Sequence, residues 1–269
     1  MFKNVLVGAD GKPNGRDAIA LASRLTDPDG KLTLAHVNIG PGFEAEEPEA
    51  SKELLERERD GGDVNAELIS ICAESPGRGL HQQAEEQSAD LLVVGSCSHS
   101  AFGRAMLGDD TRAALNGAPC AVAIASLGYA EHQDAIVNIG VGYDESAESD
   151  TALATAHVIA GATGAAVHAL EVVSIPSYAY TGYIPLAVGE SIDVMLEQAT
   201  NRMKALPDVD GQAVYGLTGE ELAAFSEKVD ILIVGSRGYG PAKRLVLGST
   251  SDYLQRHARS SLLVLPRGR

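Results

Sequence analysis

The residues best suited to chemistry lie in a glycine-rich segment near the carboxyl end of the chain. Gly235 and Gly238 permit positive φ and a close approach of the backbone to a ligand. Gly248 and Ser249 are placed to begin a helix, where free N–H groups and the helix dipole favour an anion. This spacing predicts a loop that surrounds phosphate groups.

Side-chain chemistry in the same segment supports phosphate as the ligand. Three cations, Arg237, Lys243 and Arg244, follow the first glycine, and no acid stands between Gly235 and Ser251. The expected helix start adds hydroxyl donors at Ser249, Thr250 and Ser251. The whole chain carries a net charge of −16, so this local positive charge is unusual. The alternative interpretation is a glycine-rich turn that holds no ligand.

The spacing of these glycines resembles the nucleotide-binding signature of the universal stress protein family, G-x2-G-x9-G-[S/T]. Gly235, Gly238, Gly248 and Ser249 match that signature position by position. The similarity extends along both halves of the chain, which therefore looks like a tandem member of the family. The resemblance implies an ATP-binding protein of the stress response, with Mg²⁺ expected beside the ATP.

Particular residues receive roles from that resemblance. Asp144 would contact the adenosine, and Val172 would contact the adenine through its backbone. Val234 and the loop 235–238, which includes Arg237, would line the nucleotide. The phosphates would be held by Gly248, Ser249, Thr250 and Ser251. For Asp144 the alternative is a purely structural role as a cap of the helix that follows it.

The first half of the chain repeats the same pattern. Residues 89–95 read Ala-Asp-Leu-Leu-Val-Val-Gly, and residues 229–235 read Val-Asp-Ile-Leu-Ile-Val-Gly. Each run is followed, at the same distance, by a second Leu-Gly step. A repeat this long indicates a duplicated domain rather than a solenoid. We expect one domain over residues 1–128 and another over 134–269, joined by a short polar linker at 127–135.

The nucleotide signature is incomplete in the first copy. Ser98 replaces the second glycine, and Asp109 and Asp110 stand where the family has Ser or Thr. Each of these carboxylates would repel phosphate by ~1–4 kcal/mol near a partly shielded site, so occupancy would fall by about tenfold or more. Their alternative role is helix capping. We therefore predict one ATP site in the second half and a degenerate first site comprising Asp10, Val37, Gly95 and Gly108.

Alternating strand and helix patterns must position these loops. In the first half, strands are expected near residues 5–9, 31–37, 65–72, 91–94 and 120–125, with helices near 14–25, 51–59, 76–88 and from 109. In the second half, strands are expected near 136–142, 166–173, 212–216, 230–234 and 261–265, with helices near 147–160, 189–205, 219–227 and 249–257. This alternation predicts two doubly wound five-stranded α/β domains with parallel sheets, whose ligands bind beyond the carboxyl ends of the strands.

The family resemblance implies a strand order of 3-2-1-4-5 in each domain. It also implies pairing through the last strands, so residues 121–125 and 262–265 are expected to meet inside one molecule as a pseudo-dimer. Such pairing would cover two sheet edges. Further homodimerisation is compatible with this arrangement, and a protein partner is expected but not identified by the residues.

Composition narrows the compartment and the partners. Neither half has an evident basic face, which disfavours nucleic acid as a partner. Three widely spaced cysteines without a C-x-x-C motif favour a reducing cytosol over a disulfide framework. No signal peptide precedes the first strand, and no apolar run approaches the ~20 residues that span a bilayer. We therefore expect a cytoplasmic protein without membrane insertion.

Two further segments have a chemical and a structural interpretation. Cys97-Ser98-His99 could suggest a metal, but no second ligand pair stands at metal spacing, and an exposed loop with a free thiol is the simpler interpretation. The segment between the second strand and the next helix contains Tyr178, Tyr180 and Tyr183. The structural interpretation is a packed connection. The functional interpretation is a flap over the nucleotide or a patch for self-association.

Three functions are compatible with the residues. The first is a regulatory protein that binds ATP as a ligand and does not turn it over quickly, because no catalytic base is placed near the phosphates. The second is an enzyme, at most a slow ATPase, since the P-loop and dinucleotide-binding motifs are missing. The third is an interaction protein of the same fold that binds no nucleotide.

Overall fold

The structure is a computed structural model that describes residues 1–39, 48–96, 113–114, 116–132, 135–174, 186–236, 245 and 247–267. The first lobe contains β1 (Phe2–Gly8), α1 (Pro13–Leu25), β2 (Thr26–Ile39), α2 (Pro48–Gly61), β3 (Glu67–Ala73), α3 (Pro76–Glu86), β4 (Leu91–Gly95) and β5 (Ala121–Ala125). The helix α5 (Tyr129–His132) follows it. The second lobe contains β6 (Asn138–Gly142), α6 (Ala147–Thr163), β7 (Ala166–Val173), α7 (Leu186–Lys204), β8 (Asp210–Tyr215), α8 (Thr218–Ser226), β9 (Ile231–Gly235), α9 (Ser249–His257) and β10 (Ser261–Leu265).

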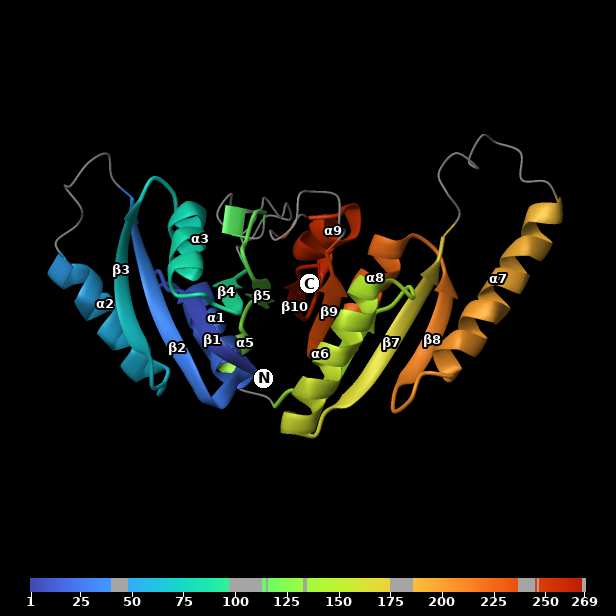
Figure 1. The fold of residues 1–269 in the computed structure, drawn as a ribbon, viewed down its shortest axis with the longest axis horizontal. Coiled ribbons are helices and arrows are strands. Elements are labelled where there is room, and N and C mark those ends of the chain that lie inside the picture. Colours follow the sequence, from blue (N-terminus) through green and yellow to red (C-terminus); the bar gives the residue numbers. More distant parts are fainter. Residues whose placement is uncertain are drawn as a thin grey trace.

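All ten strands join into one sheet, in the order β3-β2-β1-β4-β5-β10-β9-β6-β7-β8. Each lobe therefore has the order 3-2-1-4-5, with parallel neighbours. The two lobes meet where β5 and β10 pair antiparallel, with Leu263 opposite Ala123. Figure 1 shows this pair at the centre of the molecule and the helices α2 and α7 at its two outer ends. The predicted fold class and the internal pseudo-dimer are confirmed.

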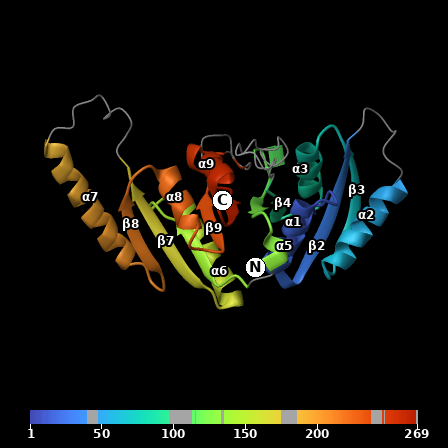
Figure 2. The same cartoon turned by 180° about the vertical axis from the view of Figure 1, so that it is seen from behind.

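The strands form because their side chains are apolar on both faces of the sheet. Val5, Leu6 and Val7 are all fully buried, as expected for a parallel strand covered by helices on both sides. One core cluster lies under α1, α2, α6 and α7, and the other lies under α3, α8 and α9. Figure 2 shows the same sheet from behind. Each cluster contains residues of both lobes, so the two lobes share a continuous core.

The expected linker contains a helix that the residue pattern does not predict. The helix α5 lies within residues 127–135 and packs against α1. The buried carboxylate of Asp17 explains its position, because it accepts hydrogen bonds from the backbone N–H groups of Gly128 at 2.9 Å and Ala130 at 2.8 Å. The connection between the lobes is therefore docked on the first lobe.

Other element boundaries differ modestly from expectation. The strand β2 begins at Thr26, earlier than the expected residue 31, because Thr26 already pairs with Phe2 across an irregularity in the register. The helix expected from residue 109 falls largely outside the described residues, of which 113 and 114 are helical. Within the described part of the chain, no helix is long and apolar enough to cross a membrane.

Candidate functional site

A cavity of about 590 Å³ opens at the carboxyl ends of the central strands of the second lobe. It is bounded by the turn after β6, the end of β7, the end of β9 and the start of α9. In a doubly wound sheet this is the point where the strand order reverses and where ligands bind. The cavity volume lies within the range of about 300–1,000 Å³ that is usual for small-molecule sites.

Asp144 lines this cavity at the turn that follows β6. Its exposed carboxylate accepts hydrogen bonds from the backbone N–H and the hydroxyl of Ser146. The N-cap of α6 is Ser146, whose hydroxyl accepts a hydrogen bond from Ser149 N at 3.1 Å. Asp144 is thus not the residue that caps the helix directly. It organises the capping turn and presents its carboxylate to the cavity.

The end of β7 supplies the apolar wall of the cavity. Leu170, Val172 and Ser174 line the cavity and alternate along the strand, so their side chains lie on one face of the sheet. Val234, at the end of β9, is buried and faces the same space. The predicted positions Val172 and Val234 are therefore brought together with Asp144 around one cavity.

Behind the cavity, a charged cluster holds the same segments from the opposite face of the sheet. Glu171 is buried and forms an ion pair with Arg202 of α7, whose guanidinium also lies 2.9 Å from Glu145. Glu145 follows Asp144 directly and takes a φ of +61°, a conformation that non-glycine residues rarely adopt. The hydrogen bond to Glu171 raises the pKa of Arg202, which keeps this cation charged.

Gly235 has a reason to be glycine that is independent of any ligand. A Cβ atom at this position would lie 2.6 Å from Glu148 Cβ at the start of α6. The same contact occurs in the first lobe, where a Cβ atom at Gly95 would lie 2.1 Å from the carbonyl oxygen of Asn14. Both glycines therefore allow the first helix of each lobe to approach the sheet closely. This shared requirement explains why Gly95 is kept in the copy with the incomplete signature.

The start of α9 contributes backbone and hydroxyl groups. Gly248, Thr250 and Ser251 line the cavity, and Ser249 is the exposed first residue of the helix. The buried Ser251 hydroxyl accepts a hydrogen bond from Gly248 N at 3.0 Å, so part of its hydrogen-bonding capacity already serves the helix start. The remaining predicted loop residues lie outside the described part of the chain: Arg237, Gly238, Lys243 and Arg244.

Several lining residues were not predicted from the sequence. Among them are Ser146, Glu148, Ser149, Thr218, Leu222 and Arg267, whereas Ser236 belongs to the loop 235–238 that was expected to line the ligand. A usable signal existed for Arg267, which stands two residues beyond β10 and therefore at the strand end where ligands bind. Its Nε atom lies 3.3 Å from a carboxylate oxygen of Glu148.

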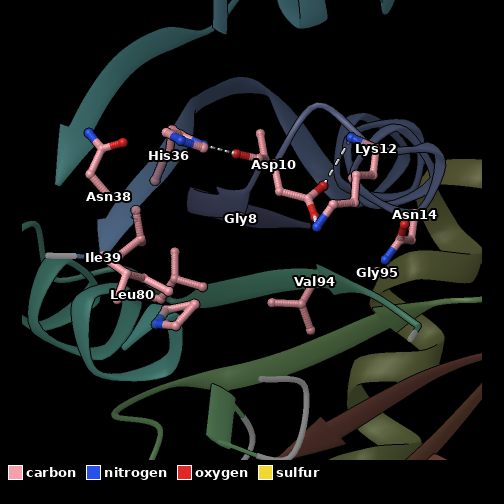
Figure 3. Close-up of a pocket in the computed structure, with 15 residues that line it drawn as sticks. Gly8, Asp10, Lys12, Asn14, His36, Asn38, Ile39, Leu80, Val94 and Gly95 are labelled. Carbon is pink, nitrogen blue, oxygen red and sulfur yellow. Dashed lines mark hydrogen bonds and ion pairs between the residues drawn. The ribbon is translucent and has the colours of Figure 1, made fainter. Parts of the chain in front are cut away.

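The first lobe keeps a cavity of about 410 Å³ at the equivalent place (Figure 3). Asp10, Val37 and Gly95 line it as expected, and Gly108 lies outside the described residues. The Asp10 carboxylate is paired with the Lys12 ammonium group at 3.1 Å, as Figure 3 shows. Lys12 and Asn14 follow Asp10 at the same distances at which Ser146 and Glu148 follow Asp144. The first-lobe cavity thus has an ammonium group and an amide where the second-lobe cavity has a hydroxyl and a carboxylate.

Other predicted features fall outside the described residues. These are the Cys97-Ser98-His99 run, Asp109 and Asp110, and the tyrosines Tyr178, Tyr180 and Tyr183. Among the residues that the structure does describe, no group of three or more His, Cys, Asp or Glu side chains could hold a metal ion.

Comparison with known proteins places these features in a family. The chain matches the model of the universal stress protein family over residues 1–126 and again over 136–266. A universal stress protein of Mycobacterium tuberculosis is 27% identical over 238 residues, which cover 77% of this chain and 77% of that protein. The solved universal stress protein of Archaeoglobus fulgidus covers 98% of both chains, with a TM-score of 0.66 and 19% identity. A universal stress protein solved in complex with cAMP covers 47% of this chain and 98% of its own, with a TM-score of 0.40 and 21% identity.

Proposed function

Because the chain belongs to the universal stress protein family, we propose that it is a regulatory protein of the stress response that binds ATP in its second lobe. The observation that carries this proposal is the cavity where Asp144, Val172, Val234 and the start of α9 converge. A helix N-terminus next to the point where the strand order of a parallel sheet reverses is a place where phosphate-bearing ligands bind.

The second lobe, rather than the first, is proposed as the ATP site. Its cavity is the larger of the two and is lined by the hydroxyls of Ser146, Ser149, Thr218 and Ser236. Its loop carries the complete glycine signature and three cations, whereas the first copy has Ser98 and two consecutive aspartates. Hydroxyl donors and cations favour a phosphate chain, and carboxylates disfavour it.

ATP is proposed to act as a ligand whose occupancy changes the conformation or the assembly of the protein. Phosphoryl transfer needs a group that positions or activates the attacking nucleophile. Among the described residues that line the cavity, the acids are Asp144, which holds the turn before α6, and Glu148 at the start of α6, and neither belongs to the segment 235–251 proposed to hold the phosphates. Mg²⁺ would accompany the ATP through its phosphate oxygens, because this ion is usually held by substrate phosphates and few protein groups.

The test is mass spectrometry of the purified protein after denaturation, followed by calorimetry with ATP, ADP, AMP and cAMP, each with and without Mg²⁺. We expect ATP to be released from the wild-type protein. Gly238→Asp should abolish its retention, because a carboxylate would enter the phosphate loop. The matched control is Ser98→Asp, which introduces the same carboxylate at the equivalent position of the first copy. It should leave ATP retention unchanged. A wild-type protein that releases no nucleotide on denaturation and gives no binding heat with any of the four nucleotides would overturn the proposal.

A further inference from the structure

Arg267 occupies a position that brings a cation to the phosphate end of the second-lobe cavity. The strand β10 ends at Leu265, whose carbonyl oxygen accepts a hydrogen bond from Ser236 N at 2.9 Å. The carboxyl end of β10 therefore lies beside the start of the loop that follows β9. Arg267 is two residues further on and lines the cavity together with Gly248 and Thr250.

Charge makes this residue distinctive. Among the described residues that line the cavity, the acids are Asp144 and Glu148 and the only base is Arg267. Its side chain is 69% exposed, whereas that of Glu148 is 21% exposed. An exposed ion pair of this kind contributes little to stability, and a guanidinium forms charge-assisted, two-pronged hydrogen bonds with phosphate as well as with carboxylate oxygens. Arg267 is thus able to exchange its carboxylate for a phosphate.

The first lobe has neither member of this pair. Gly95 and Gly235 make equivalent contacts with Asn14 and Glu148, so these two residues correspond. By the same repeat, Leu265 corresponds to Ala125 at the ends of β10 and β5, and Arg267 therefore corresponds to Leu127. An amide and an exposed leucine stand where the second lobe has a carboxylate and a guanidinium.

We propose that Arg267 is a phosphate-binding residue that leaves Glu148 when a nucleotide binds, and that it makes the second lobe selective for phosphorylated adenosine over the nucleoside. This inference rests on the proposed function and identifies a chemical determinant of that site outside the glycine signature. Glu148 holds Arg267 at the cavity in the free protein and competes with phosphate for it.

The test compares ATP, ADP, AMP and adenosine by calorimetry on the full chain. Arg267→Leu installs the residue of the first lobe and should weaken ATP binding by about tenfold or more, the usual scale for the loss of one charged hydrogen-bonding group. It should leave adenosine affinity within about twofold, because adenosine offers no phosphate to lose. Arg267→Lys keeps the positive charge but loses the paired N–H donors of the planar guanidinium, so it should give an intermediate affinity for ATP. Glu148→Gln should strengthen ATP binding, since it releases Arg267 and removes a repelling carboxylate.

Arg259→Leu is the matched control, because Arg259 is also an exposed arginine paired with a carboxylate, Glu227 at 3.9 Å, and does not line this cavity. It should leave both affinities unchanged. Equal affinity of the wild-type and Arg267→Leu proteins for ATP would overturn the inference while leaving the proposed function intact. Equal losses for ATP and adenosine would also overturn it, as they would indicate a structural effect. A wild-type protein that binds none of the four compounds would overturn both.

Discussion

Leu245 and Ala118 form a backbone link between the two lobes. Leu245 N donates to Ala118 O at 2.8 Å, and the neighbouring Gly117 N donates to Leu245 O at 2.9 Å. The Leu245 side chain is fully buried in the core cluster that contains residues of both lobes. Leu245 stands between Gly235 and Gly248, so the proposed phosphate loop of the second lobe is anchored on the first lobe.

Leu245→Ala tests this anchor. We expect a loss of about 2–5 kcal/mol in the free energy of unfolding, because the side chain leaves a cavity in a shared core. We also expect weaker ATP binding, because the loop loses its fixed point. Urea denaturation and calorimetry measure the two effects, and Leu217→Ala, at an exposed leucine, should change neither. An unchanged ATP affinity would show that the loop is held by other contacts.

Gly235→Ala tests the close approach of α6 to the end of β9. The added methyl group would meet Glu148 Cβ at 2.6 Å, so we expect a loss of about 1–3 kcal/mol in unfolding free energy. The control is Gly161→Ala in the last turn of α6, where nothing lies within 4 Å of the new methyl group. That change should stabilise the protein by about 0.5–1 kcal/mol, the helix-propensity difference between the two residues. Opposite signs in chemical denaturation are the expected outcome, and two losses of equal size would contradict it.

Asp17→Ala tests the docking of the connection between the lobes. The buried carboxylate serves two backbone N–H groups, those of Gly128 and Ala130, and its removal leaves both without that acceptor. We expect a loss of about 1–3 kcal/mol in unfolding free energy. Amide hydrogen exchange should increase at residues 128 and 130 and stay unchanged in β6. The exposed Asp29→Ala is the control. Unaltered exchange at the two amides would rule out the carboxylate as the anchor.

Tyr143 predicts a pH effect on stability. Burial, followed by the 2.8 Å hydrogen bond to Asp150, raises the pKa of this phenol to about 12. The ordinary value is about 10, so the neutral phenol stabilises the fold below that pH, and the contribution is lost as pH rises from about 10 to about 12. Tyrosinate absorbance should reveal a late-titrating group in the wild-type protein, which Tyr143→Phe removes. Asp150→Asn should lower that pKa only in part, because burial is the larger cause. A wild-type curve identical to that of Tyr143→Phe would refute the assignment.

The architecture could be predicted from sequence because it depends on repeated local patterns. Runs such as residues 91–95 and 231–235 are apolar enough to mark buried strands, and their repetition fixes two equivalent sheets. The pairing of β5 with β10 followed from the family resemblance. The earlier start of β2 was not predicted, since Pro28 and Gly30 are typical of a loop and only the partner strand β1 makes the segment extended.

The site was predictable only in part. Asp144 could be placed at the cavity because it follows a strand, and Val172 and Val234, near the ends of β7 and β9, because the family resemblance implied their roles. The helix α5 and the role of Arg267 depend on contacts between residues far apart in the chain, Gly128 with Asp17 and Arg267 with Glu148. Gly235 was predicted to be a glycine because of a ligand, and the structure shows a different reason, the close packing of α6 against the end of β9.

The covalent connection between the lobes has a consequence for stoichiometry. Because β5 and β10 close the sheet within one chain, every molecule carries one cavity of each kind at any protein concentration. A dimer of identical single-lobe chains would separate on dilution and would hold two equal cavities. In this chain every molecule has the same two different cavities. Dilution leaves the two lobes paired, because they belong to one chain.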